Sequence, residues 1–154
     1  MINVQIARMI ATFFYCGKFP VAPGTLATAA GLALAWFLRW NFWAYLLVMV
    51  AVTVLGFVAS GVAEKSYGRK DPGCIVIDEV SGVMISFFML PMYGPVMIIG
   101  FFLFRAFDMF KIPPADRMEA LGGAKGIMLD DIVAGLYTNL ILHVAIRLSG
   151  VYTF

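Results

Sequence analysis

The chain has 154 residues, 62% of them hydrophobic and 13% charged, with a net charge of +2 and a mean hydropathy of +0.93. Soluble domains are about half apolar and about a quarter charged, so this composition excludes an ordinary soluble protein and predicts an integral membrane protein. The small net charge, with Lys and Arg scattered through the predicted loops, also argues against nucleic-acid binding.

Cysteine usage and chain organisation narrow the possible classes further. Cys16 and Cys74 lie in separate segments without metal-ligand spacing, so we expect neither a disulfide framework nor a zinc site. No linker, repeat or low-complexity tract divides the sequence, and we expect one membrane domain over residues 1–154. The N-terminus lacks the basic start and cleavage site of a signal peptide, so we expect the mature protein to begin at Met1.

The first part of the chain predicts three helices. From the second residue, apolar side chains recur at i, i+4, i+7, i+8 and i+11, which predicts an amphipathic helix over residues 2–14 that lies in the membrane interface. After a break containing proline and glycine, a short apolar helix is expected over residues 25–38. A turn at residues 39–41 then leads to a full membrane span over residues 42–63.

The second part predicts a helical hairpin and a final helix. Residues 80–104 are apolar but contain Pro91 and Pro95, which favours two shorter helices over one span. The last apolar helix is expected over residues 132–148. The fold class is therefore an all-α integral membrane bundle of about five hydrophobic helices, two of them a Pro-broken hairpin, plus an N-terminal amphipathic interfacial helix. With alternating crossings, nine of the eleven Lys and Arg fall on one face, which the positive-inside rule makes cytoplasmic.

Acidic residues gather in three short clusters, and alternating crossings place all three on the cytoplasmic face. Burying a carboxylate is costly unless it is paired or binds a metal. Asp78 and Glu79 begin the third hydrophobic helix, where they either cap the helix N-terminus or bind a cation. Gly82 and Ser86 follow Asp78 at i+4 and i+8 and form a small polar stripe, which permits close approach of a ligand or another helix.

The second cluster combines acid and base on one helix. Arg105, Asp108 and Lys111 recur every three residues and so spread over about a third of the helix circumference. One interpretation is a structural Arg–Asp pair. The other gives Asp108 to a metal ion and the two cations to a phosphate.

The third cluster follows the glycine-rich stretch 122–126. That stretch either forms an ordinary turn or presents backbone N–H groups to phosphate oxygens. Asp130 and Asp131 point about 100° apart on a helix, so one can bind a cation while the other orients a ligand or water. Gly135 and Asn139 extend a small polar stripe from Asp131, and this stripe can face the one in the first cluster across a site.

Two further features have competing interpretations. Pro23–Gly24–Thr25 is either a turn with a helix N-cap or a phosphate contact through the threonine hydroxyl and free amides. His143, deep in the last helix, is interpreted as a packed or hydrogen-bonded residue rather than a catalytic base.

Four motifs stand in order over residues 15–140. They are Pro20-Val-Ala-Pro23-Gly24-Thr25, then Ile75-Val-Ile-Asp78-Glu79-Val-Ser-Gly82 after Asp71-Pro72, then Phe104-Arg105-Ala-Phe-Asp108-Met-Phe-Lys111, and Gly126-Ile-Met-Leu-Asp130-Asp131-Ile-Val-Ala-Gly135. Together they resemble the phosphatidylglycerophosphatase A family. The resemblance implies a magnesium-dependent, all-helical enzyme of bacterial phospholipid biosynthesis. Such an enzyme releases the terminal phosphate of phosphatidylglycerophosphate, giving phosphatidylglycerol, at the cytoplasmic face of the inner membrane.

The chain departs from the family pattern in one loop. The family often has a proline directly after the position of Lys111, whereas here Ile112 precedes two prolines. Ala124 and Lys125 also lengthen the glycine run, and Lys125 can add a contact to phosphate.

With this resemblance, we expect hydrolysis of a phosphomonoester at a site of carboxylates and cations. The expected Mg²⁺ ligands are Asp78, Glu79, Asp108, Asp130 and Asp131. The expected phosphate-binding residues are Thr25, Arg105, Lys111 and Lys125. The expected catalytic residues are Glu79, Asp108, Asp130 and Asp131, and the nucleophile is either a water molecule or one of the aspartates.

Two alternative functions use the same residues. One is a phosphatase that acts on another lipid or on a soluble phosphomonoester. The other is a small cation transporter subunit, whose acids would line a pathway near mid-membrane, whereas these acids cluster at predicted helix ends. The sequence predicts no particular oligomeric state or number of metal ions.

Overall fold

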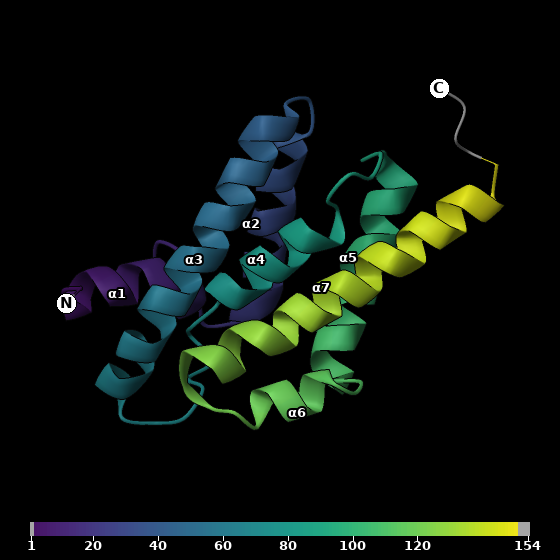
Figure 1. Ribbon diagram of the computed structural model, residues 1–154. Coiled ribbons are helices and arrows are strands. Elements are labelled where there is room, and N and C mark those ends of the chain that lie inside the picture. The colour runs from purple at the N-terminus through teal and green to yellow at the C-terminus, as the bar shows by residue number, and fades with distance from the viewer. Residues whose placement is uncertain (1, 151–154) are drawn as a thin grey trace.

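The computed structural model describes residues 2–150, which contain seven α-helices, one 3₁₀-helix and no strand (Figure 1). The all-α prediction is therefore confirmed. In chain order the elements are α1 (Val4–Ala11), η1 (Cys16–Lys18), α2 (Pro23–Leu38), α3 (Phe42–Tyr67), α4 (Ile77–Ser86), α5 (Gly94–Phe110), α6 (Ala115–Glu119) and α7 (Gly123–Leu148).

Four of the five apolar helices lie close to where the sequence predicts them, and the fifth, α7, begins earlier. Helix α2 starts two residues early, and α3 extends four residues beyond the predicted end of its span. Helices α4 and α5 form the predicted hairpin around the two prolines. The short helix α6 was not predicted.

The start of α7 corrects the sequence analysis. This helix begins at Gly123 rather than at residue 132, so residues 123–126 form its first turn and Gly122 is its N-cap. Gly126 lies against α6, and a Cβ there would be 2.8 Å from the backbone oxygen of Glu119. The glycine therefore permits close packing of α6 on α7.

Helix α1 is shorter than the predicted amphipathic helix. Asn3 caps its N-terminus by accepting a 2.8 Å hydrogen bond from the backbone N–H of Gln5. Left-handed backbone from Phe13 to Tyr15 prevents the helix from continuing. Fully buried Ala7 and Ala11 allow α1 to pack across α3 (Figure 1).

Helix α4 lies at the centre of the bundle, between α2, α3, α5 and α7 (Figure 1). Eight of its ten residues are buried. A ten-residue helix is only about 15 Å long, so α4 does not by itself reach across a bilayer of about 30 Å. Because the first turn of α4 is packed against the surrounding helices, a polar residue there needs a hydrogen-bond or metal partner.

Helices α3 and α7 are long and apolar enough to cross a membrane, judged by length and composition. Both expose apolar side chains on the side that faces away from the bundle. On α7 these are Leu136, Leu140, Val144 and Leu148, spaced four residues apart. The opposite side of the same helix contains the buried acids and Gly135, so the two faces of α7 differ sharply in polarity.

Candidate active site

Three carboxylates from two helices converge at one point in the bundle. Asp78 and Glu79 lie in the first turn of α4, and Asp131 lies in the third turn of α7. Each of the three offers an oxygen, and these oxygens all lie within 4.8 Å of one another. Carboxylates at this separation repel one another unless a cation or a proton lies between them.

The two small polar stripes bring these acids together. A Cβ on Gly82 would lie 2.7 Å from the backbone oxygen of Asp131, and a Cβ on Gly135 would overlap the backbone oxygen of Gly82. The side chain of Asn139 donates to the backbone oxygens of Ser86 at 3.2 Å and Phe88 at 2.9 Å. The predicted stripes therefore do face each other, and they pack directly against one another.

Unpaired oxygens in this cluster fit a metal ion. Asp78 Oδ1, Glu79 Oε2 and Asp131 Oδ2 are buried and have no hydrogen-bond partner among the described residues. Asp131 is 2% exposed and Asp78 9% exposed. Buried oxygens without a donor are costly, and hard carboxylate oxygens are the ligands that Mg²⁺ prefers. The donor set thus suits the metal that the sequence predicts.

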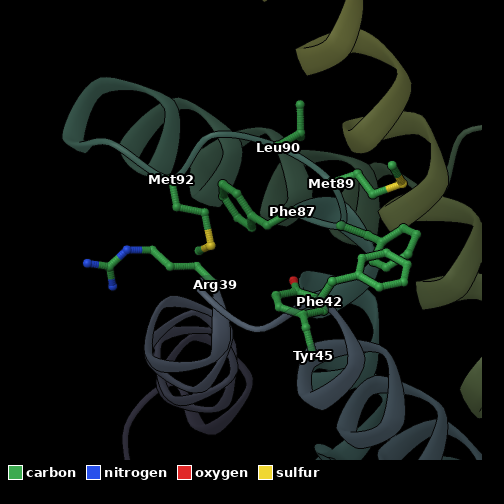
Figure 2. A pocket seen from close by; sticks show the side chains of 8 residues that line it. Arg39, Phe42, Tyr45, Phe87, Met89, Leu90 and Met92 are labelled. Atoms are coloured by element: carbon green, nitrogen blue, oxygen red, sulfur yellow. The ribbon is translucent and has the colours of Figure 1, made fainter. Parts of the chain in front are cut away.

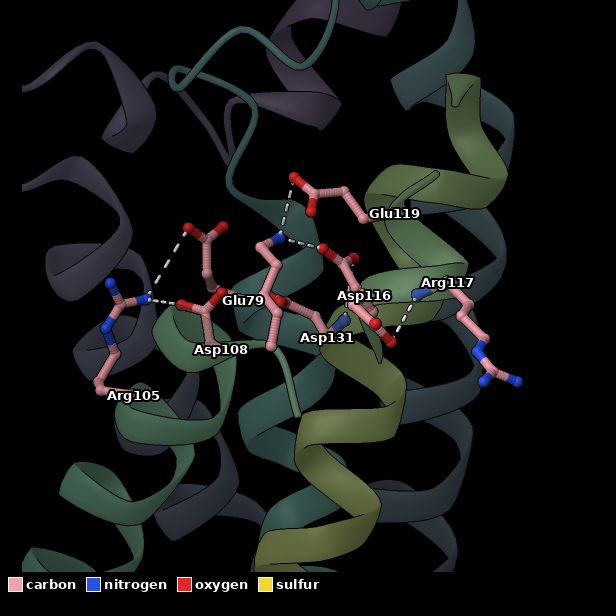
Figure 3. Close-up of polar contacts among 9 residues, drawn as sticks. Glu79, Arg105, Asp108, Asp116, Arg117, Glu119 and Asp131 are labelled. Atoms are coloured by element: carbon pink, nitrogen blue, oxygen red, sulfur yellow. Dashed lines mark hydrogen bonds and ion pairs between the residues drawn. The ribbon is translucent and has the colours of Figure 1, made fainter. Parts of the chain in front are cut away.

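Arg105 lies on the α5 side of the cluster. Its Nη1 donates to Asp108 Oδ2 at 2.5 Å and lies 4.0 Å from Glu79 Oε1 (Figure 3). The structural Arg–Asp pair is therefore present, and it is part of the acid cluster rather than separate from it. In Figure 3 the carboxylates of Asp108 and Asp131 point toward each other.

Lys111 points to a different acid. It follows the last residue of α5 in left-handed backbone with φ of 45°, so it does not continue the helical spacing of Arg105 and Asp108. Its Nζ donates to Asp130 Oδ2 at 2.5 Å and lies 3.4 Å from Glu119 Oε1. The prediction that all three residues share one helix face is wrong for Lys111, because the chain turns at this residue toward α7.

The two adjacent aspartates have separate environments. Asp131 lies with Asp78 and Glu79 in the carboxylate cluster. Asp130 accepts a hydrogen bond from Lys111 through Oδ2. Its other oxygen, Oδ1, accepts a 3.0 Å hydrogen bond from the backbone N–H of Asp131. Both oxygens of Asp130 are thus hydrogen-bonded within the protein. The expected division of the pair between two tasks agrees with this geometry, and Asp131 is the member with an unpaired oxygen.

Lys111 is held as a cation by its neighbours. Burial alone would lower the pKa of its ammonium, but the hydrogen bond to Asp130 and the charges of Asp130 and Glu119 raise the pKa overall. Glu119 was not predicted as a site residue. No local signal identifies it, because α6 reaches Lys111 only through the packing of α6 on α7.

The remaining predicted phosphate contacts lie at two helix starts. Thr25 is exposed in the first turn of α2, directly after Gly24, whose Cβ position overlaps Glu79 Oε1. Lys125 is exposed in the first turn of α7. Within residues 2–150, neither side chain makes a hydrogen bond or ion pair with the cluster, so both contacts stay predictions.

An apolar pocket of about 90 Å³ lies away from these charges (Figure 2). Its walls come from Arg39 at the end of α2, from the first turn of α3 and from the chain that follows α4. Asp78 and Glu79 occupy the other end of α4, its first turn. Arg39 is its one basic lining residue, and its guanidinium lies 3.8 Å from the centre of the Trp36 ring. The pocket lacks the acids that the cluster provides.

Comparison with known families agrees with a site for a cation and a phosphate. A family profile matches this chain over residues 9–146, a range that contains every acid and base of the site described above. The profile describes phosphatases, so the protein is an enzyme of the phosphatase class. The chain belongs to the phosphatidylglycerophosphatase A family. This finding favours the phosphatase interpretation over the transporter alternative.

Individual relatives cover most of the chain. A phosphatidylglycerophosphatase A of Escherichia coli is 34% identical over 141 residues, which cover 88% of this chain and 81% of that protein. One of Haemophilus influenzae is 31% identical over 139 residues, covering 88% and 85%. A Bacteroides thetaiotaomicron protein described as a candidate phosphatidylinositol-3-phosphatase is 34% identical over 146 residues, covering 89% and 91%. No solved structure matches the chain.

Proposed function

We propose that this enzyme is a Mg²⁺-dependent phosphatase that hydrolyses phosphatidylglycerophosphate to phosphatidylglycerol and phosphate in bacterial phospholipid biosynthesis. One observation carries the proposal: three carboxylates with buried, unpaired oxygens form a cluster beside Arg105, and Lys111 is held by the adjacent Asp130. The family and two named relatives support the substrate.

Asp78, Glu79 and Asp131 would hold the metal ion. They are the acids whose buried oxygens have no partner within residues 2–150, whereas Asp130 is fully engaged by Lys111 and a backbone N–H. When bound, Mg²⁺ supplies charge that polarises the phosphoryl oxygens. Asp108 remains a candidate ligand, because Arg105 engages only one of its oxygens.

Arg105 and Lys111 would bind the phosphoryl group. Both cations come from the end of α5 and are held by acids of the site, so little reorganisation is needed when charge develops on the phosphoryl oxygens. Arg105 offers further N–H donors beyond the one that Asp108 accepts, which suits contact with two phosphate oxygens.

The reaction transfers the phosphoryl group to water. The water oxygen bonds to phosphorus and gives up a proton, and the bond between phosphorus and the glycerol oxygen breaks. The glycerol oxygen takes up a proton from solvent, which balances the one that the water gives up. We infer that Asp108 accepts the proton of the attacking water. This role is supported by its free Oδ1, which makes no hydrogen bond within residues 2–150, and by its carboxylate, which points toward Asp131 (Figure 3).

A membrane position follows from the apolar helices. We propose a multi-pass protein of the bacterial inner membrane, with α3 and α7 as spans and the active site at the cytoplasmic face. Two arguments support this orientation. The α6 end of the bundle contains the end of α3, the end of α5 and the start of α7 (Figure 1). In the sequence, Lys65, Lys111, Arg117 and Lys125 belong to these segments or to α6 itself. The apolar faces of the spans are suited to acyl chains.

Phosphate release by the purified enzyme tests this proposal. We expect release from phosphatidylglycerophosphate in Mg²⁺, loss of release in EDTA, and recovery when Mg²⁺ is restored. No release in Mg²⁺ would overturn the function. Because the Bacteroides relative is described as a candidate phosphatidylinositol-3-phosphatase, phosphatidylinositol 3-phosphate should be assayed as a second substrate. A kcat/KM higher for this lipid than for phosphatidylglycerophosphate would identify it as the preferred substrate.

A further inference from the structure

The N-terminus of α2 has free backbone donors. Its N-cap is Ala22, which is in left-handed backbone with φ of 46° and offers no side-chain acceptor. Pro23 follows without an N–H, and within residues 2–150 the N–H groups of Gly24 and Thr25 have no acceptor. A sixteen-residue helix with an uncapped start carries partial positive charge there and attracts anions.

This helix start touches the acid cluster. A Cβ on Gly24 would overlap Glu79 Oε1 and would lie 3.4 Å from Arg105 Nη1. The first turn of α2 is therefore next to both a cluster carboxylate and the cluster guanidinium. A Cβ at position 24 would force the Glu79 carboxylate to shift, while its distance to Arg105 is an ordinary contact.

A second, independent observation indicates a ligand here. Asp78 and Asp131 are at least nine-tenths buried, and each has an oxygen without a partner among the described residues. The unpaired carboxylate oxygens suit a cation, while the free amides of α2 suit an anion. Arg105 is already paired with Asp108 and has further N–H donors for that anion. A phosphate monoester bound together with a divalent cation satisfies both demands at once.

We propose that the backbone N–H groups of Gly24 and Thr25 bind phosphoryl oxygens of a phosphate monoester beside the carboxylate cluster. A side chain at residue 24 would require the Glu79 carboxylate to move. The inference rests on the proposed function and adds a part of the site that no side chain provides. It assigns the Thr25 contact to the amide rather than to the hydroxyl.

Two substitutions at Thr25 separate amide from hydroxyl. Thr25→Ala removes the hydroxyl and keeps the N–H, whereas Thr25→Pro removes both. Proline is tolerated in the first turn of a helix, where the N–H has no intrahelical partner. The probe is inorganic phosphate, measured by its inhibition constant, Ki, in Mg²⁺ against lipid substrate, with the KM of the lipid as the second arm.

We expect Thr25→Pro to raise the Ki of phosphate and the KM of the lipid about tenfold, the loss typical of one hydrogen bond to a charged group, while Thr25→Ala stays near wild type. A rise in KM with an unchanged Ki overturns the proposal, because free phosphate shares the same chemistry. Equal rises in both variants also overturn it and assign the contact to the hydroxyl. Unchanged values in Thr25→Pro overturn it as well.

Gly24→Ala decides the matter if Thr25→Pro does not fold. The added methyl displaces Glu79, so we expect a Ki for phosphate at least about tenfold higher and weaker Mn²⁺ binding by electron paramagnetic resonance. A Ki within about twofold of wild type overturns the proposal. Gly73→Ala is the matched control, because its Cβ meets nothing within 4 Å.

The two proposals fail separately. If the wild type releases phosphate from the lipid but the variants bind phosphate normally, only the amide contact is wrong. If the wild type binds phosphate in a Mg²⁺-dependent way, loses this binding in Thr25→Pro, and yet releases nothing from phosphatidylglycerophosphate, the amide contact stands and the substrate is wrong.

Discussion

Gly82 and Gly135 bring α4 and α7 together backbone to backbone, since the Gly82 carbonyl oxygen occupies the position where a side chain at Gly135 would begin. One turn earlier on each helix stand Asp78 and Asp131, two of the three clustered carboxylates. The short distance between α4 and α7 therefore brings the carboxylates of Asp78 and Asp131 together. Both the helix packing and the carboxylate cluster depend on Gly82 and Gly135.

Gly135→Ala should separate the two helices. Overpacking of this kind costs about 1–3 kcal/mol, which outweighs the better helix propensity of alanine. We expect a lower thermal unfolding temperature in detergent together with weaker Mg²⁺ binding. Gly94→Ala is the control, because its Cβ has open space. Wild-type stability in Gly135→Ala would contradict the close contact.

Asp131→Asn should affect stability and activity in opposite directions. Neutralising one of three mutually repelling carboxylates should stabilise the metal-free protein by about 1–3 kcal/mol, while phosphate release falls about 100-fold or more. Thermal unfolding with EDTA and with Mg²⁺ measures this: Mg²⁺ should stabilise the wild type more than the variant. A variant less stable than wild type in EDTA would show that the cluster is satisfied without a cation.

Asp130→Asn should act through Lys111. Because both oxygens of Asp130 are hydrogen-bonded within the protein, we expect the variant to keep Mg²⁺ binding and to raise the KM for the lipid. Residues that act as one unit are not additive, so Lys111→Met combined with Asp130→Asn should cost little more than Lys111→Met alone. Additive losses, or loss of Mg²⁺ binding in Asp130→Asn, would contradict this role.

Asn139→Ala should weaken the fold without changing the chemistry. The side chain donates to two carbonyl oxygens at the end of α4, and their loss should cost about 1–3 kcal/mol. Asn139 lies eight residues from Asp131, about 12 Å along α7, so kcat at low temperature should stay near wild type. Leu140→Ala, at an exposed position, is the control. A large fall in kcat would place Asn139 in the active site.

Most helices and acidic clusters could be predicted because their signals are local. Apolar runs and the prolines at 91 and 95 determine where helices begin and end, and the small residues after Asp78 and Asp131 show which helix face allows close approach. A glycine-rich stretch does not by itself show whether the chain forms a turn or a closely packed helix. The stretch 122–126 was expected as a turn or as a phosphate-binding segment, yet residues 123–126 are helical and Gly126 packs against α6.

The sequence by itself determined an all-helical, apolar chain with acids and bases at particular helix positions, and its motifs indicated the phosphatase family. Only the tertiary structure decided how these charges are paired. Asp131 meets Asp78 and Glu79, Asp130 meets Lys111, and Glu119 joins them from a helix that was not predicted. The reason is physical: periodicity along one helix specifies a face, but which faces meet, and at what height, depends on packing between residues far apart in the chain.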